Sequence, residues 1–148
     1  MSLEAAKELA PTGVLRAAIN MSNFLLVTGR TAGGDPDGVS PDMARELAKR
    51  LGVDLELIQY KTPGEVSDDA GKGIWDIGNI GAEPKRAEKI DFTAAYCEIQ
   101  STYMVPPGSK ITSLDQVDQT GNRIAVSARS AYDLWLERNI KKAELVRV

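Results

Sequence analysis

The chain has 148 residues, 43% of them hydrophobic and 26% charged, a composition typical of one soluble globular domain with its own core. Its net charge of −3, without a basic block, argues against binding to nucleic acid or to an anionic membrane surface. It has no histidine and one cysteine, Cys97. An intramolecular disulfide is therefore excluded, and we expect neither a metal site nor a cofactor.

No apolar run approaches the roughly 18–20 residues of a transmembrane helix. The first residues, Met-Ser-Leu-Glu-Ala-Ala-Lys-Glu, are charged and lack the apolar core of a signal peptide. Either the protein is cytoplasmic, or a natural signal peptide has been replaced at Met1. The residues alone leave both alternatives open.

The first sixty residues predict a strand, a helix and a second strand. Residues 14–19 form a short apolar, β-like run. A helix is expected next, with Ser40 as its N-cap, Pro41 in its first turn and Gly52 as its stop. Residues 53–60 then alternate like a strand. Short links between these elements predict a βαβ unit and a parallel sheet.

The rest of the chain predicts further alternation of strands and helices. Before a break at Pro106–Ser109, these are a helix over 64–72, a strand over 74–80, a short helix over 84–89 and an extended run over 98–105. After the break they are a helical turn at 112–115, a strand over 122–127, a helix over 130–141 and a β-like run over 143–148. The break is the best candidate for a domain boundary.

The stretch from Gly73 to Tyr96 is predicted to join a short strand, a glycine-bearing loop and a short helix. Pro84 opens the helix, and Arg86 lies in its first turn. Backbone N–H groups at a helix start beside a fixed guanidinium suit a small anion such as a carboxylate. The alternative for Arg86 is a solvated arginine on a helix surface.

Four segments, in order, carry the motifs of a known family. Asp37 to Gly52 is similar to a helix of pattern G-x-D-x-D-L-A-x-x-L-A-x-x-L-G, and Trp75 to Tyr96 is similar to D-I-x…T-P-E-R…x-D-F-T-x-P-Y. Ser113 to Val126 is similar to S-L-x-D-L-x-G-K-x-V-A-V, and the helix start at Ser130 to a G-S/T-T turn. The chain thus resembles the type 2 periplasmic solute-binding proteins, specifically the amino-acid-binding family of ABC importers (extracellular solute-binding protein family 3).

This resemblance implies an α/β fold of the periplasmic binding protein-like II class, in which two lobes close on a ligand by a hinge. Residues 1–104 would form lobe 1, and residues 105–148 would begin lobe 2. In the family lobe 2 continues further, so we expect the first lobe complete and the second only partly present. A partial lobe with an uncovered sheet predicts self-association with another chain.

The resemblance also implies a ligand site in the cleft between the lobes. Arg86 would hold the ligand carboxylate by a two-pronged hydrogen bond. Backbone N–H groups would come from the loop of Gly78, Asn79, Ile80, Gly81 and Ala82. This loop is shorter than the family's, and it has Gly81 and Ala82 where Ser or Thr donors are common. A plain strand-to-helix turn is the alternative.

Further candidates follow from the resemblance. In lobe 2, Ser130 would add a donor at a helix N-terminus, with ordinary helix capping as an alternative or a concurrent role. Arg129, where the family usually has glycine, either adds a second cation to the cleft or points outward. Tyr132, on the same helix, is a further candidate for facing the cleft.

In lobe 1, Asn23 and Phe24 follow the first strand, where the family places an aromatic platform for the ligand side chain. A position in the core is the alternative for Phe24. Trp75 is expected to pack under a helix. Glu83 is expected to cap the helix that begins at Pro84 and not to act as a catalytic acid.

The function implied by the resemblance is that of a periplasmic solute-binding component of an ABC importer. It would bind an amino acid or a related small carboxylate, work with a membrane permease and catalyse no reaction. One rival is an enzyme on the same scaffold, such as a cyclohexadienyl dehydratase, which turnover of prephenate or arogenate would reveal. Others are a ligand-sensing module of a receptor and an α/β domain that self-associates through an exposed edge.

Overall fold

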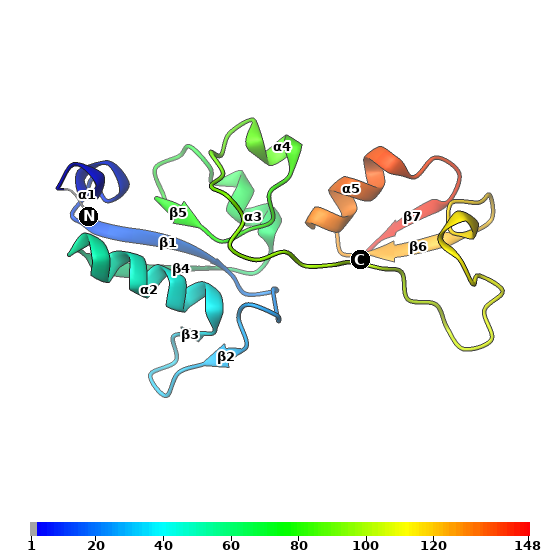
Figure 1. Ribbon diagram of the computed structural model, residues 1–148, viewed down its shortest axis with the longest axis horizontal. Helices are drawn as coiled ribbons and strands as arrows, with labels where there is room; N and C mark the ends of the chain where they lie inside the picture. The colour runs from blue at the N-terminus through cyan, green and yellow to red at the C-terminus, as the bar shows by residue number, and fades with distance from the viewer. Residues whose placement is uncertain (1–2) are drawn as a thin grey trace. The chain divides into compact units, whose positions relative to one another are not determined.

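The computed structural model describes residues 3–148, which form two compact units (Figure 1). Unit 1 extends up to Gly81, and unit 2 comprises Ala82–Val148. These units are not the two lobes that the sequence predicts, which are residues 1–104 and residues 105–148. The division into lobes is expected from the family resemblance, and it stays a prediction.

Unit 1 is built around a parallel sheet. Its elements are α1 (Leu3–Leu9), β1 (Val14–Asn20), β2 (Gly29–Arg30), β3 (Pro36–Asp37), α2 (Val39–Leu51), β4 (Asp54–Tyr60), α3 (Pro63–Asp68) and β5 (Ile77–Gly78). The sheet has the order β4-β1-β5, with Val14 opposite Asp54 and Ala17 opposite Ile77. β2 and β3 form a separate antiparallel pair. The predicted βαβ unit is confirmed as β1–α2–β4.

The core of unit 1 lies along β1, as expected for the central strand of a parallel sheet covered on both faces. Ala17 and Ile19 pack in one buried cluster with Ala44 of α2, and Leu15 packs with Ala48 one turn further along that helix. Because both helix positions are alanines, α2 can lie close to the sheet.

The start of α2 differs from the prediction, which made Ser40 the N-cap. α2 begins at Val39 with Gly38 as its N-cap, and the N–H of the buried Ser40 donates to the Leu26 oxygen (2.9 Å). Gly38 has a φ of 129°, and a Cβ there would lie 2.7 Å from the same oxygen. The chain before the helix passes so close to residues 26–28 that a glycine is required.

Two other local predictions, at Gly52 and Trp75, are confirmed. Gly52 ends α2 in a left-handed conformation. Thr62 and Glu65 form a capping box, in which Thr62 Oγ1 accepts from the Glu65 N–H (3.3 Å) and the Glu65 carboxylate accepts from the Thr62 N–H (3.2 Å). Trp75 packs against α3, since its Nε1 donates to the carbonyl oxygen of Val66 (3.1 Å).

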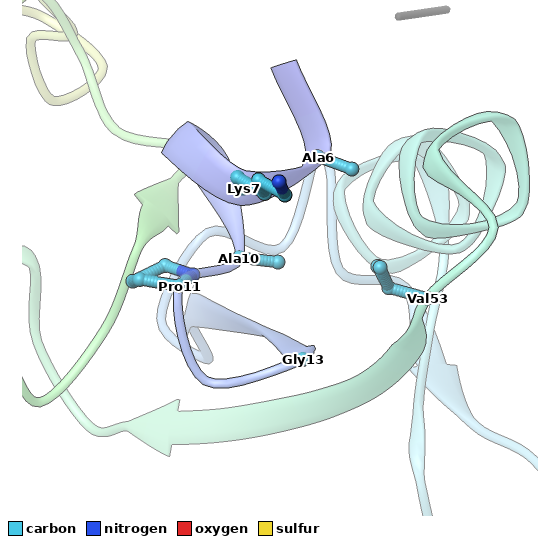
Figure 2. A pocket seen from close by; sticks show the side chains of 6 residues that line it. All are labelled: Ala6, Lys7, Ala10, Pro11, Gly13 and Val53. Atoms are coloured by element: carbon cyan, nitrogen blue, oxygen red, sulfur yellow. The ribbon is translucent and has the colours of Figure 1, made fainter. Parts of the chain in front are cut away.

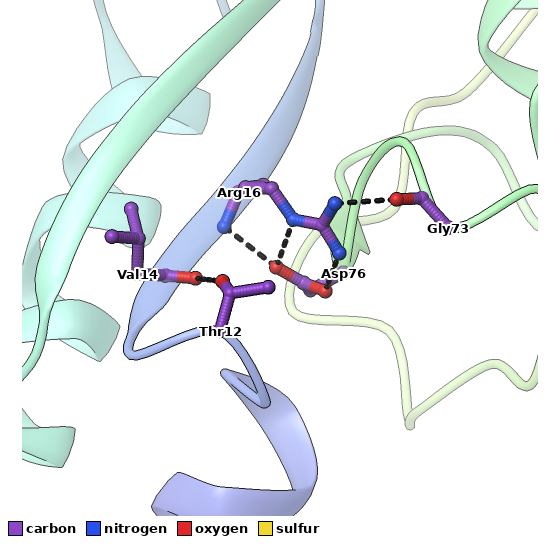
Figure 3. A network of polar contacts seen from close by, with 5 residues as sticks. All are labelled: Thr12, Val14, Arg16, Gly73 and Asp76. Carbon is purple, nitrogen blue, oxygen red and sulfur yellow. Dashed lines mark hydrogen bonds and ion pairs between the residues drawn. The ribbon is translucent and has the colours of Figure 1, made fainter.

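β5 is shorter than the predicted strand over residues 74–80, and an ion pair fixes its place. Just before it, the Asp76 N–H donates to the Arg16 oxygen of β1 (2.9 Å), and the Arg16 N–H donates to Asp76 Oδ2 (2.9 Å). The Arg16 guanidinium binds both carboxylate oxygens, through Nη2 to Oδ1 (2.6 Å) and Nε to Oδ2 (3.0 Å), and also bonds to the Gly73 carbonyl (Figure 3).

This ion pair also governs the ionisation of Asp76, whose side chain is 8% exposed. Burial alone would raise the pKa of Asp76, but the hydrogen bonds from the Arg16 side chain and N–H outweigh it and hold that pKa below its usual value.

Unit 2 contains a second βαβ arrangement. Its elements are α4 (Pro84–Ala87), a 3-10 turn (Leu114–Gln116), β6 (Arg123–Val126), α5 (Ala131–Asn139) and β7 (Glu144–Arg147). β6 and β7 pair in parallel, and Ile124, Val126 and Leu136 lie in a buried cluster between this sheet and α5. The predicted β-like run over 98–105 forms neither strand nor helix, because a strand needs a hydrogen-bonded neighbour and β6 and β7 form a two-stranded sheet of their own.

We expect Asp76→Asn to lower the midpoint of thermal unfolding at pH 7 by roughly 5 °C, because an amide cannot replace a carboxylate that accepts from a guanidinium and a backbone N–H. The folded pKa lies below the unfolded value of about 3.9. The stabilisation is therefore present above about pH 4 and lost as the pH falls through the folded pKa. Calorimetry of both proteins at pH 7, 5 and 3 measures this.

Glu46→Gln is the control, because Glu46 forms an exposed pair with Arg50, and it should change the midpoint little. An effect of Asp76→Asn that does not depend on pH would contradict the role given to the ion pair.

Gly38→Ala should lower the free energy of unfolding by about 2–3 kcal/mol, because the new Cβ meets the Leu26 oxygen in a backbone conformation that disfavours side chains. Urea unfolding followed by circular dichroism measures the change. Gly33→Ala is the matched control in the same loop, where the nearest atom to an added Cβ is 3.8 Å away. Equal stabilities for the two variants would refute the close approach at Gly38.

Candidate functional site

The parallel strands of unit 1 end at one edge of the sheet. β1 ends at Asn20, β4 at Tyr60 and β5 at Gly78. The chain crosses from β1 to β4 on one side and reaches β5 on the other, so the carboxyl end of β1 is a topological switch point. Ligands of open α/β sheets bind at such a point. The candidates of unit 1 lie in the segments that leave this edge.

Asn23 and Phe24 lie in a tight loop after β1. Asn20 Oδ1 accepts from the Ser22 N–H (3.2 Å) and hydroxyl (2.8 Å), and the Val27 N–H donates to the Asn23 oxygen (2.8 Å). Phe24 is 78% exposed, so the alternative of a core position is wrong. A role of Phe24 as a platform for a ligand side chain stays a prediction.

The loop of Gly78–Ala82 starts at the same edge. Asn79 Nδ2 donates to the carbonyl oxygen of Ser40 (3.0 Å), which ties the loop to the first turn of α2. Ile80 is half-buried and Gly81 is exposed. Carboxylate binding by the N–H groups of this loop stays a prediction.

Arg86 lies in unit 2 and is buried, with 3% exposure, so the alternative of a solvated surface arginine is wrong. Its Nη2 donates to the carbonyl oxygen of Arg129 (3.1 Å), just before α5. Burial, followed by the nearby charge of Arg129, lowers the pKa of Arg86. The ordinary arginine pKa is so high that the guanidinium stays charged at neutral pH.

Glu83 has the capping role that the sequence predicts. Its Oε2 accepts from the Lys85 N–H (2.9 Å) at the start of α4. Its Oε1 pairs with Arg138 of α5. Sequence reasoning missed this second bond, because the partners are 55 residues apart and nothing local marks them.

The turn before α5 holds the other candidates of unit 2. Ser130 Oγ accepts from the Asp133 N–H (3.1 Å), so Ser130 caps α5. A further role of Ser130 as a hydrogen-bond donor to a ligand stays a prediction. Arg129 is exposed and has a φ of 60°, unusual for a side-chain-bearing residue. The buried Asp133 carboxylate supports this turn by accepting from the Arg129 N–H (2.8 Å) and from Arg147 Nε of β7 (3.1 Å).

Tyr132 extends this group along α5. It is 48% exposed, and Trp135, one turn further along the helix, is exposed to a similar extent. The two aromatic side chains are neighbours by helical spacing. Tyr132 as a ligand contact stays a prediction.

A shallow apolar depression of about 360 Å³ lies at the opposite edge of the unit 1 sheet (Figure 2). It is lined by Ala6, Lys7, Ala10, Pro11, Gly13 and Val53. Gly13 and Val53 immediately precede β1 and β4, so the depression faces the amino ends of the strands. It is therefore separate from the candidate site at the carboxyl edge.

Within residues 3–148, no group of three or more histidine, cysteine, aspartate or glutamate side chains is arranged to hold a metal ion. The helices in this range are also too short or too polar to cross a membrane.

The chain belongs to the bacterial extracellular solute-binding proteins, family 3, because the profile of that family matches residues 18–146. The L-cystine-binding protein TcyJ of Escherichia coli is 26% identical over 113 residues, which cover 76% of this chain and 42% of TcyJ. Cyclohexadienyl dehydratase of Pseudomonas aeruginosa is 27% identical over 139 residues, which cover 91% of this chain and 51% of the enzyme. The chain thus spans about half of these curated relatives, or less.

The solved structure of an ancestral amino acid-binding protein, AncCDT-1, has a TM-score of 0.78 with this chain at 22% identity. The match covers 97% of this chain and 64% of that one. The fold class predicted from the sequence, periplasmic binding protein-like II, is confirmed.

Ser130→Ala should lower the free energy of unfolding by about 1 kcal/mol, because the Asp133 N–H loses its acceptor at the start of α5. Ser130→Asn should retain most of that stability, since asparagine also caps helices. Chemical unfolding measures both variants, with Ser127→Ala at the nearby exposed position as the control. A Ser130→Ala variant as stable as the Ser127→Ala control would refute the capping role.

Proposed function

We propose that the chain belongs to the extracytoplasmic solute-binding component of an ABC importer and binds an amino acid or a related small carboxylate. The observation that carries this proposal is the buried guanidinium of Arg86 at the family's arginine motif, in a chain whose residues 18–146 match the family. A planar guanidinium matches the two oxygens of a carboxylate, and it binds them strongly where water is excluded.

In this proposal the ligand lies between lobe 1, residues 1–104, and lobe 2, which begins at residue 105. Arg86 and the N–H groups of Gly78–Ala82 hold the carboxylate. The remaining contacts are proposed from Asn23, Phe24, Arg129, Ser130 and Tyr132. A membrane permease receives the ligand when the lobes open.

The similar proteins support an amino acid as the ligand. The E. coli relative is an L-cystine-binding protein. Solved structures with the same fold include a cysteine-binding protein of Campylobacter jejuni and a protein of Wolinella succinogenes described as a putative binding component of an ABC transporter, complexed with lysine. Their side chains differ, whereas every amino acid carries the carboxylate that Arg86 would bind.

A second candidate is a dehydratase, which the similarity to the P. aeruginosa enzyme favours. Such an enzyme needs a general acid or base, and without histidine a carboxylate is the first choice. Among residues 3–148, the buried carboxylates are Glu83 and Asp133, and each is bound by a backbone N–H and an arginine. Both carboxylates are thus engaged within the protein, which favours a binding protein over an enzyme.

The test is isothermal titration of the full-length natural protein with L-cystine, L-cysteine, L-lysine, L-arginine, L-glutamate and succinate. We expect at least one of them to bind and Arg86→Ala to weaken that binding by about 100-fold, the loss of a two-pronged charged hydrogen bond. Arg50→Ala, on the exposed side of α2, should bind like the wild type.

Absence of binding by the whole panel, or unaltered affinity in Arg86→Ala, would overturn the proposal. Turnover of prephenate or arogenate by the same preparation would instead establish the dehydratase.

A further inference from the structure

α4 is too short to hold its own position. It has four residues, Pro84–Ala87, and a single turn of helix is unstable in water without tertiary contacts. The N–H groups of Arg86 and Ala87 donate to the carbonyl oxygen of Glu83 (3.0 and 2.9 Å). The backbone that carries Arg86 is therefore tied directly to Glu83.

The side chain of Glu83 is held at both oxygens and is 3% exposed. Oε2 accepts from the Lys85 N–H, and Oε1 pairs with Arg138 near the end of α5. A buried carboxylate with one partner in each helix joins the start of α4 to α5. Removing the Arg138 guanidinium would leave the Glu83 charge buried without its countercharge.

A second contact joins the same two helices. Arg86 Nη2 donates to the carbonyl oxygen of Arg129, which precedes the first turn of α5. Arg129 precedes the N-cap of this nine-residue helix, and Arg138 lies in its last turn. Contacts at two separated points restrict rotation of α4 as well as its translation.

Arg86 needs such support because its charge is buried and lies near a like charge. Burial and the charge of Arg129 both disfavour the protonated form of Arg86. Both Glu83 oxygens are thus engaged by partners within the protein.

We propose that Glu83 and Arg138 are positioning residues that hold Arg86 in the orientation that binds a carboxylate. The proposal rests on the proposed function of Arg86 as the carboxylate-binding residue. It assigns a role in binding to Arg138, which lies 52 residues from Arg86 in the sequence.

The test uses the full-length protein with Arg138→Met, which keeps the apolar stem and removes the charge, and Arg138→Lys, which restores it. Titration with the six compounds named above should show affinity about tenfold weaker in Arg138→Met and largely recovered in Arg138→Lys. In an Arg86→Ala background, Arg138→Met should leave the residual affinity unchanged. Arg123→Met, in a loose exposed pair with Glu144, is the matched control and should bind like the wild type.

A second readout needs no ligand. The ¹⁵N resonance of Arg86 Nε can be assigned by its absence in Arg86→Ala. In Arg138→Met this resonance should shift, and the Nε–H proton should exchange faster with solvent. Both changes should be reversed in Arg138→Lys. An unchanged resonance in Arg138→Met, or equal losses of affinity with and without Arg86, would overturn the positioning role. If Arg86→Ala binds normally, the proposed function fails, and the resonance still decides whether Arg138 positions Arg86.

Discussion

The sheet of unit 1 depends on the ion pair between Arg16 and Asp76. β5 contributes only Ile77 and Gly78, and two residues of backbone pairing are too few to specify a register. The Asp76 carboxylate adds bonds to both the backbone and the side chain of Arg16, so β5 has one position along β1. A slip by one residue would turn every side chain of the strand to the other face. The pair therefore determines where the loop after Gly78 leaves the sheet.

Unit 2 uses buried carboxylates in a similar way. Glu83 and Asp133 each accept a hydrogen bond from a backbone N–H in a turn and pair with an arginine distant in the sequence, Arg138 and Arg147 respectively. In each pair the arginine supplies the countercharge, which offsets the cost of desolvating the buried carboxylate. The turns placed in this way are those that carry Arg86 and Arg129. The one-turn helix α4 and the turn before α5 are thus held in place by ion pairs.

The sequence predicted elements whose signals are local and missed features that depend on distant contacts. The βαβ unit, the helix stop at Gly52 and the capping role of Ser130 follow from spacing within a few residues, and the structure confirms them. The N-cap was misplaced at Ser40 because the helix start is set by contact with residues 26–28, which are brought there only by folding. The extended run over 98–105 has β-forming residues, but propensity supplies no partner strand. Arg86 was found through a motif, whereas its link to Arg138 has no counterpart in the local sequence.

Two glycines beside the candidate site differ in what they permit over evolutionary time. At Gly38 any side chain collides with backbone, so this position is closed to sequence drift. At Gly78, whose φ is not in the left-handed region, an added Cβ would meet only ordinary contacts with Ala18 and Val66, 3.5 and 3.6 Å away. A Cβ can therefore be added at position 78 without disturbing the scaffold. The edge of the sheet can therefore accept a small side chain at position 78, whereas the turn that leads into α2 cannot accept one at position 38.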